Sequence, residues 1–204
     1  MDSSGGWRAI AETPALGSHI LMWGDATQTT EDVLEAFLRG SLARDDLLAV
    51  TLPREELLSL RARMATRGLD LGDLERAGRA VIVGSEDAYR DGDPVAATSR
   101  VLLQFKEMAA ERGKRQVSLL GKIAPVAFGR GETAVAHEIE RVAQREGGDF
   151  RILCLYDANS LTPDRIVSAA GLVRLHTHTI TPAEGETHAE KVANPQERPG
   201  TAGL

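Results

Sequence analysis

The sequence lacks several features that define whole classes of proteins. Its 204 residues include one cysteine, Cys154, so no internal disulfide can form, and no CxxC pair provides a zinc framework. No apolar run reaches the roughly 20 residues that cross a bilayer. We therefore expect a protein of the reducing cytoplasm without a membrane partner.

An excess of basic residues is also missing. The chain has 24 lysines and arginines against 30 aspartates and glutamates, which gives a formal net charge of -6 and a pI near 5.4. Binding to nucleic acid without sequence preference depends on clustered basic side chains that neutralise phosphates. The composition therefore disfavours nucleic acid as a direct partner.

The first strand-loop-helix segment, HILMWGDATQTTEDVLEAF (residues 19–37), lacks the glycines and the lysine of a phosphate-binding loop. Gly24 stands alone, and Asp25 and Glu31 are placed where they would repel a phosphate at the start of the helix. The chain also shows no dinucleotide fingerprint and no pattern typical of a Ser-His-Asp triad. We therefore expect no catalytic residues and no cofactor.

Apolar runs of strand length alternate with amphipathic helical patterns along most of the chain. The expected strands are 19–23, 47–52, 79–84, 116–121, 150–156 and 172–176, and the expected helices are 30–44, 53–68, 94–113, 133–148 and 162–171. Nearly continuous apolar strands that alternate with helices predict an α/β fold, a single three-layer domain with a mostly parallel sheet flanked by helices.

The two ends of the chain differ in composition from the middle. We expect residues 1–16 to form a flexible segment, residues 17–180 to form the α/β domain, and residues 181–204 to form a disordered tail. The tail is rich in Pro, Gly, Glu and Thr, so it has little apolar surface to offset the loss of chain entropy on folding.

Ligands of parallel sheets bind beyond the carboxyl ends of the strands. In this chain, several side chains that could bind a ligand directly follow an expected strand. Lys122 ends a buried strand and either contacts an anion or an acidic neighbour, or extends into solvent. Asp157, which follows Tyr156, either orients a ligand or ties down its own loop. Cys154 would need a nearby histidine to act as a nucleophile, and an inert buried cysteine is the favoured interpretation.

Histidines provide a weak metal-binding pattern near the end of the domain. His176 and His178 alternate with threonines and would share one face of the expected last strand. Two histidines at a fraying edge make a poor site, so we expect no metal, although the sequence leaves open whether they bind one.

The order of the motifs resembles the MEDS family, the methanogen/methylotroph sensory domain of prokaryotic regulators. The resemblance covers residues 17–178 and is carried by AFLRGSLARDDLLAVTLPREE, by the LERAGR turn with DAY after it, and by the late CLYD. It implies a RecA/KaiC-like fold with a degenerate phosphate loop. It also implies that His19, Asp25, Tyr156 and Asp157 line a ligand pocket, while Lys122 stands where the family usually has an acid.

The resemblance implies a cytoplasmic, non-catalytic sensory domain that takes part in signal transduction or transcription regulation. Such a domain would bind a small organic or anionic ligand, or a regulatory partner such as a kinase, an anti-sigma factor or a transcription factor module. Self-association into a homo-oligomer also fits this role. The alternative is an enzyme or NTPase-like protein that uses Lys122, Asp25 and Asp157 around a phosphorylated or anionic small molecule.

Overall fold

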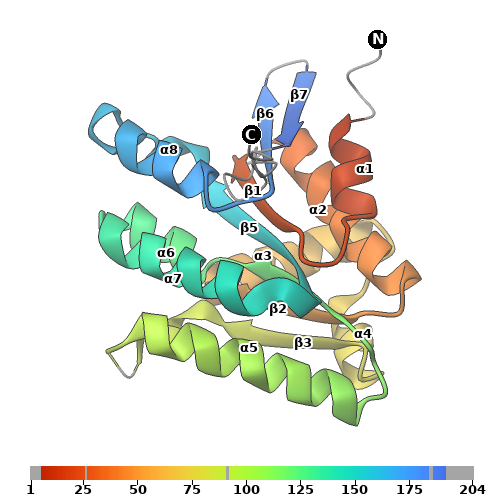
Figure 1. Cartoon of the computed structure of the whole chain (residues 1–204). Coiled ribbons are helices and arrows are strands. Elements are labelled where there is room, and N and C mark those ends of the chain that lie inside the picture. The colour runs from red at the N-terminus through yellow and green to blue at the C-terminus, as the bar shows by residue number, and fades with distance from the viewer. Residues whose placement is uncertain (1–5, 26, 91, 184–185, 192–204) are drawn as a thin grey trace, which may run out of the picture.

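A seven-stranded sheet runs through the centre of the molecule (Figure 1). The computed structural model describes residues 6–25, 27–90, 92–183 and 186–191. The strand order is β3-β2-β4-β5-β1-β6-β7, and neighbouring strands from β3 to β6 pair in parallel, while β7 pairs with β6 antiparallel. The strands are β1 (His19–Gly24), β2 (Leu47–Leu52), β3 (Ala80–Gly84), β4 (Val117–Gly121), β5 (Phe150–Asp157), β6 (His178–Ala183) and β7 (Glu186–Lys191).

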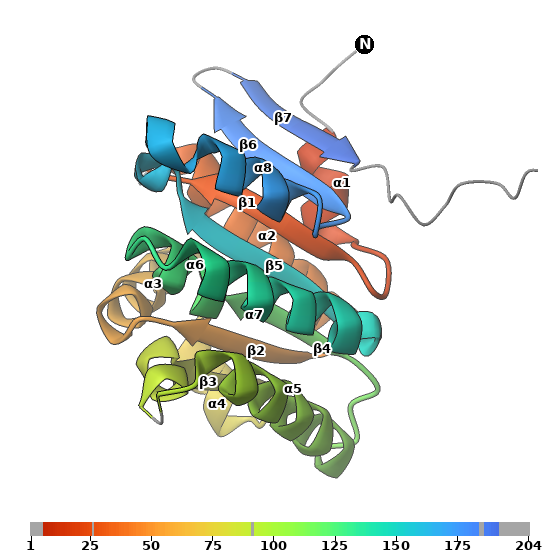
Figure 2. The same cartoon turned by 60° about the vertical axis from the view of Figure 1, so that its left-hand side comes forward.

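Helices cover both faces of the sheet, which confirms the predicted three-layer α/β fold (Figure 2). The first face carries α1 (Gly6–Glu12), α2 (Gln28–Ala43), α3 (Arg54–Thr66) and α4 (Leu71–Arg76). The second face carries α5 (Pro94–Glu111), α6 (Ile123–Gly129), α7 (Thr133–Glu146) and α8 (Ile166–Val173). None of the helices in the described part of the chain is long and apolar enough to cross a bilayer.

Each central strand is buried on both faces, which explains why its sequence is a nearly continuous apolar run. In β1, Ile20 and Met22 pack toward α1, α2 and α3, while Leu21 and Trp23 pack toward α6 and α7. The period of two along a strand thus divides the core into two layers. The first five expected strands are confirmed to within one residue at each end.

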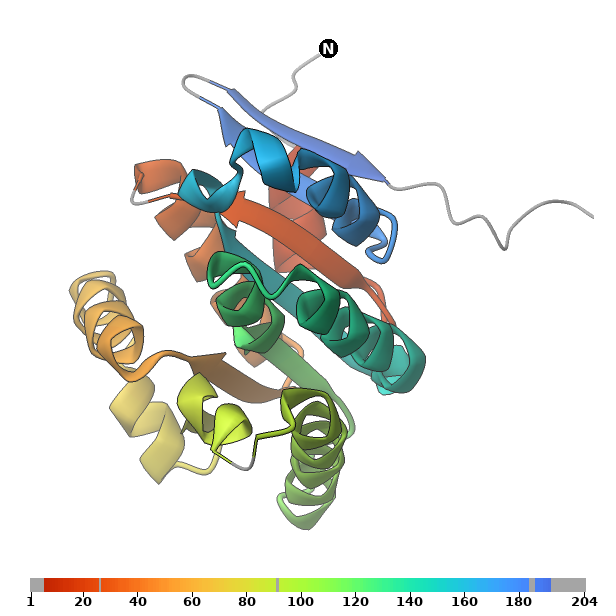
Figure 3. The same ribbon diagram turned by 90° about the vertical axis from the view of Figure 1, so that its left-hand side faces the viewer.

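The parallel strands end at one edge of the sheet, toward which the arrowheads of β1 and β2 point in Figure 3. Gly24 of β1 pairs with Asp157 of β5, and Cys154 of β5 pairs with Gly121 of β4. The loops that follow these strands are therefore neighbours, although they lie far apart in the sequence. We call this side of the molecule the carboxyl edge.

The expected strand at residues 172–176 is wrong. Helix α8 continues through Val173 and buries Leu172, and β6 begins only at His178, where it pairs with Ile20 of β1. In a short apolar run, the sequence pattern alone does not distinguish a helix from a strand. The helix face that already contains Ala169 and Leu172 decides the outcome here.

The N-terminal segment was expected to be flexible, but α1 occupies part of it. Trp7 is 8% exposed and Ala11 is fully buried, and both side chains belong to the core formed with α2. Residues 1–5 lie outside the described residues. The error arose because a helix with only two core residues gives too weak a periodic signal.

The segment expected to be a disordered tail contains part of β6 and all of β7. The ladder between these strands joins His178 with Lys191 and Ala183 with Glu186. An edge hairpin is held mainly by backbone hydrogen bonds, so it does not require the apolar alternation that the sequence lacks. Residues 184–185 and 192–204 lie outside the described residues.

The packing of α1 on α2 depends on the absence of a side chain at Gly40. A Cβ atom there would lie 1.9 Å from the carbonyl oxygen of Glu12. We expect Gly40→Ala to lower the free energy of unfolding by about 1–3 kcal/mol, since overpacking displaces the backbone of α1. Urea denaturation measures this change.

Gly129→Ala is the matched control, because a Cβ at this other helical glycine would meet nothing within 4 Å. Alanine favours a helix over glycine by up to about 1 kcal/mol, so this variant should be unchanged or slightly more stable. Equal stability of both variants would contradict the packing of α1 described above.

Candidate functional site

The five predicted site residues fall into two groups in the structure. Asp25, Lys122 and Asp157 lie at the carboxyl edge, as expected from the ends of their strands. His19 begins β1 instead of ending it, so the expectation that it converges with these residues is wrong. Tyr156 belongs to both groups, because it lines the cavity at the carboxyl edge and its phenol reaches a buried cluster with His19.

A cavity of about 470 Å³ opens at the carboxyl edge between α2, α3 and the ends of β1, β4 and β5. We call it the edge cavity. Its polar lining contains four carboxylates and two basic side chains, which are Asp25, Glu31, Glu56, Asp157, Arg63 and Lys122. This excess of negative charge differs from the basic lining that binds phosphates.

Lys122 contacts an acidic neighbour, which was one of its two predicted interpretations. Its Nζ lies 2.9 Å from Oε1 and 2.8 Å from Oε2 of Glu56, and its side chain is only 13% exposed. Glu56 comes from the first turn of α3, whose sequence PREE places acids at the helix N-terminus. The acidic partner of Lys122 therefore comes from helix α3 and is neither Asp25 nor Asp157.

Asp25 occupies the position where a phosphate loop would hold its anion. Its Oδ1 accepts hydrogen bonds from the Thr27 N–H at 3.1 Å and the Thr30 hydroxyl at 3.3 Å, just before and within the first turn of α2. Hydrogen bonding with the side chain of Thr27 is the main reason why the pKa of Asp25 is lowered, and the backbone N–H of Thr27 and the hydroxyl of Thr30 lower it further. A carboxylate of the chain thus takes the role that an anionic ligand has in nucleotide-binding folds.

Asp157 ties down its own loop, as one of its predicted interpretations stated. Its Oδ1 accepts hydrogen bonds from the backbone N–H and the side-chain amide of Asn159, both at 2.9 Å. In both Asp25 and Asp157, the hydrogen bonds described here are made by Oδ1.

A second group of polar side chains is buried between the sheet and α7, close to the amino-terminal half of β1. It contains His19, Glu140, Cys154, Tyr156 and His176, all at most 6% exposed, and we call it the Glu140 cluster. Oε2 of Glu140 lies 2.9 Å from Nε2 of His19, and Oε1 accepts a hydrogen bond of 2.5 Å from the Tyr156 hydroxyl. A buried carboxylate needs such partners to offset its loss of hydration.

The ionisation states in the Glu140 cluster follow from burial and mutual contact. Burial acts to raise the pKa of Glu140, but attraction to the adjacent His176 and the hydrogen bond with His19 hold it well below its ordinary value. Burial lowers the pKa of His19, and the neighbouring His176 lowers it further. The cluster therefore contains a carboxylate and a neutral His19 at pH 7.

Burial and the charge of Glu140 raise the pKa values of Cys154 and Tyr156 well above their ordinary ranges. A thiol that stays protonated is a poor nucleophile, which agrees with the inert cysteine favoured by the sequence.

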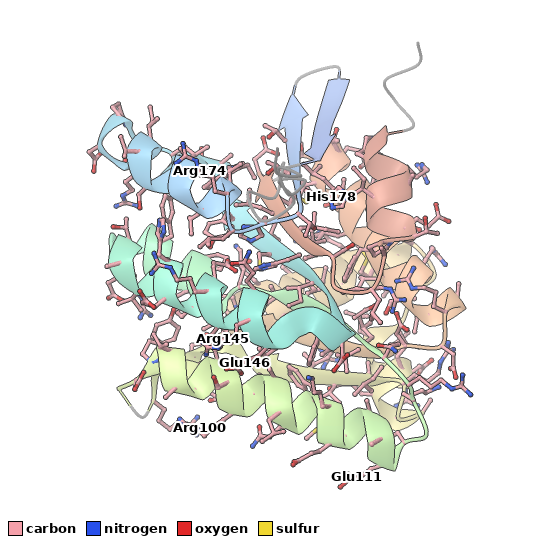
Figure 4. All side chains as sticks on the ribbon, viewed as in Figure 1. Arg100, Glu111, Arg145, Glu146, Arg174 and His178 are labelled. Atoms are coloured by element: carbon pink, nitrogen blue, oxygen red, sulfur yellow. The ribbon has the colours of Figure 1, made fainter. Side chains whose placement is uncertain are left out.

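Glu140 was not predicted as a site residue, and His176 was expected beside His178 although it contacts Glu140. A signal for Glu140 was present, because it falls on the apolar stripe of α7 between Ala136, Ile139 and Ala143, where a solvated acid does not belong. His178, which Figure 4 labels at the start of β6, instead lies within 2.9 Å of the Thr177 hydroxyl through its Nδ1. The two histidines therefore do not form the expected pair on one strand.

The chain was compared with models of protein families, with curated proteins and with solved structures. The sequence model of the family described as MEDS, the methanogen/methylotroph, DcmR sensory domain, matches residues 18–177, which is more than half of the chain. No curated protein matches the chain significantly.

Among the solved structures, the chain is similar to the KaiC-like protein PH0186 from the hyperthermophilic archaeon Pyrococcus horikoshii OT3. The TM-score is 0.55 at 16% identity, over 86% of this chain and 80% of that chain. This likeness shows the KaiC-like fold and confirms the expected architecture.

The contact between Lys122 and Glu56 can be tested by charge reversal. Lys122→Glu would place a third carboxylate beside Glu56 and near Asp157, so we expect it to lower the free energy of unfolding by about 2 kcal/mol, more than Lys122→Ala does. Part of this loss should be recovered at pH 5, where carboxylates begin to protonate. Urea denaturation at pH 5 and pH 7 measures both effects.

Lys106→Glu is the matched control, since Lys106 and its partner Asp149 are 38% and 73% exposed. Reversing the charge of an exposed pair should change stability by no more than about 0.5–1 kcal/mol. If Lys122→Glu and Lys122→Ala were equally stable at both pH values, the side chain of Lys122 would face solvent.

Proposed function

Since the chain belongs to the MEDS family of sensory domains, we propose that it is a non-catalytic, cytoplasmic sensory domain of a prokaryotic regulatory system that binds a small organic ligand in the edge cavity. The observation that carries this proposal is the edge cavity itself, a space of about 470 Å³ at the carboxyl ends of three parallel strands. Ligands of open α/β sheets bind at this edge.

The charges of the edge cavity indicate the chemistry of the ligand. Lys122 is neutralised by Glu56 at 2.8 Å, and Arg63 lies 3.3 Å from Glu31, so both basic side chains already have acidic partners. Asp25 and Asp157, which also line the edge cavity, have no ion-pair partner in the part of the chain that the structure describes. The edge cavity therefore favours a small polar molecule that carries an ammonium group or several hydrogen-bond donors.

The same charges argue against the alternative of an enzyme or NTPase that acts on a phosphorylated or anionic molecule. A phosphate at the start of α2 would meet Asp25, whose carboxylate already accepts the Thr27 N–H. We accordingly propose that the phosphate loop is degenerate and that nucleoside triphosphates are neither bound tightly nor hydrolysed.

A sensor passes its state to another surface, and the apolar side chains around α8 offer one. Ile166 and Val167 are 58% and 85% exposed, and the nearby Leu161 is 38% exposed. We propose this patch as the contact with a regulatory protein, such as a kinase, an anti-sigma factor or a transcription factor module, or with a second copy of the chain.

Ligand-induced stabilisation tests the proposed chemistry with ethanolamine as the probe, because ethanolamine carries an ammonium group and a hydroxyl. We expect millimolar ethanolamine to raise the melting temperature by at least 2 °C, since a ligand that binds only the folded state stabilises it. Acetate and Mg-ATP at the same concentrations should leave the melting temperature unchanged, and no phosphate should be released from ATP.

The double variant Asp25→Asn with Asp157→Asn should lose the response to ethanolamine. Asp149→Asn is the matched control, because Asp149 precedes β5 at the opposite edge of the sheet and is 73% exposed. Stabilisation by Mg-ATP that disappears in the double variant would overturn the proposal in favour of the enzyme. An ethanolamine response that the double variant retains would remove the edge cavity as its site.

A further inference from the structure

The Glu140 cluster brings together four potential metal ligands from four separate segments. They are Nε2 of His19 in β1, a carboxylate oxygen of Glu140 in α7, Sγ of Cys154 in β5, and Nε2 of His176 in the turn between α8 and β6. These atoms all lie within 4.8 Å of one another, and every one of these residues is buried. The chain contributes them from positions that are up to 157 residues apart.

The individual distances are close to those between the ligands of one small cation. Nε2 of His19 lies 2.9 Å from Oε2 of Glu140 and 3.3 Å from Sγ of Cys154, and Sγ of Cys154 lies 3.5 Å from Oε2 of Glu140. In tetrahedral zinc sites the bonds are about 2.0–2.3 Å long, so neighbouring ligand atoms lie roughly 3.3–3.8 Å apart. Shifts of a few tenths of an ångström to about 1 Å would complete such a site.

The tautomer of His176 is fixed by the backbone. Its Nδ1 lies 2.7 Å from the carbonyl oxygen of Leu172, and a carbonyl can only accept, so Nδ1 carries a proton. In the neutral form of this tautomer, Nε2 presents its lone pair to the cluster, where it has no hydrogen-bond partner among the described residues. It faces Oε2 of Glu140 at 3.5 Å, which places two acceptors opposite each other in a buried space.

This arrangement matches the outer contacts of known metal ligands. A metal-binding histidine commonly donates its other N–H to a backbone carbonyl, and a metal-binding carboxylate is itself hydrogen-bonded. Here the Leu172 carbonyl accepts a hydrogen bond from Nδ1 of His176, and the Tyr156 hydroxyl donates to Oε1 of Glu140, which leaves Oε2 for the cation.

We propose that His19, Glu140, Cys154 and His176 bind one divalent transition-metal ion, and that the ion is Zn²⁺. A cysteine with two imidazoles selects zinc over the hard cations Ca²⁺ and Mg²⁺, which prefer oxygen ligands. Binding releases the thiol proton of Cys154 to solvent and moves the ring proton of His19 from Nε2 to Nδ1, so that sulfur and nitrogen can each donate a lone pair. One thiolate and one carboxylate then balance the two positive charges of the ion.

The bound ion would connect α7 and the turn after α8 to the central strands β1 and β5. It would therefore act mainly on stability and on the position of α8, the helix that carries the exposed Ile166 and Val167. An apolar cavity of about 30 Å³ adjoins the cluster and includes Glu140 and Cys154 in its lining, so the site has free space on one side. This inference does not depend on a ligand in the edge cavity.

Metal content and cobalt spectroscopy test the proposal on the full chain. Protein purified without a chelator and dialysed against Zn²⁺ should hold one zinc per chain by elemental analysis, and removal of the ion should lower the melting temperature. Co²⁺ added to the metal-free protein should give a thiolate-to-cobalt charge-transfer band. Because Cys154 is the sole cysteine of the chain, this band can arise only at this site.

Four variants separate metal binding from a merely structural role. Cys154→Ala should abolish the charge-transfer band, and His176→Gln should weaken Co²⁺ binding at least 100-fold. Tyr156→Phe keeps all four ligands, so it should retain the band with an affinity reduced by about 10- to 100-fold. His137→Gln is the control, since it removes an imidazole from the helix of Glu140 at a position that contacts Ser168 instead.

The alternative to a bound metal ion is a proton on Nε2 of His176, so that His176 would donate a hydrogen bond to Glu140. In that case neither Zn²⁺ nor Co²⁺ would bind with a Kd below about 10 μM, and chelators would leave the melting temperature unchanged. Either result would overturn the proposal, as would a zinc stoichiometry and affinity that Cys154→Ala and His176→Gln leave unaltered. A wild-type chain that binds zinc without responding to ethanolamine would refute only the proposed ligand of the edge cavity.

Discussion

The buried carboxylate of Glu140 is the constraint on which much of the structure depends. A carboxylate that is 1% exposed costs several kcal/mol unless polar groups surround it, and the fold supplies these groups from β1, β5 and the turn before β6. The strand order places β1 between β5 and β6, so His19, Tyr156 and His176 approach α7 from adjacent positions. The interior of this layer is therefore organised around a charge as well as around apolar contacts.

The sheet separates this cluster from the edge cavity, although both use the same strands. Tyr156 and Asp157 are consecutive in β5, yet the phenol reaches Glu140 while the carboxylate bonds with Asn159 in the loop at the carboxyl edge. Because alternate side chains point to opposite faces and strand ends point into loops, a two-residue segment contacts both regions.

The fold was largely predictable because strands buried on both faces give long apolar runs, as LLAVTL in β2 and FRILCLY in β5 do. Lys122 and Asp157 could be placed at the carboxyl edge for the same reason. The partners of Lys122 and His19 could not be predicted, because Glu56 and Glu140 lie 66 and 121 positions away and only the packing of α3 and α7 brings them near. The hairpin of β6 and β7 was not predicted, because it is held by backbone hydrogen bonds, which leave no apolar pattern in the sequence.

We infer that the Glu140 cluster is a metal site and not a metal-free network of hydrogen-bonded side chains. Diffraction from crystals of the zinc-loaded protein, recorded on both sides of the zinc absorption edge, tests it most directly. We predict one anomalous peak bonded to His19, Glu140, Cys154 and His176, with Zn–N distances of about 2.0–2.1 Å and a Zn–S distance of about 2.3 Å. An interior without a peak, in which a protonated Nε2 of His176 donates a hydrogen bond to Glu140, would contradict this inference.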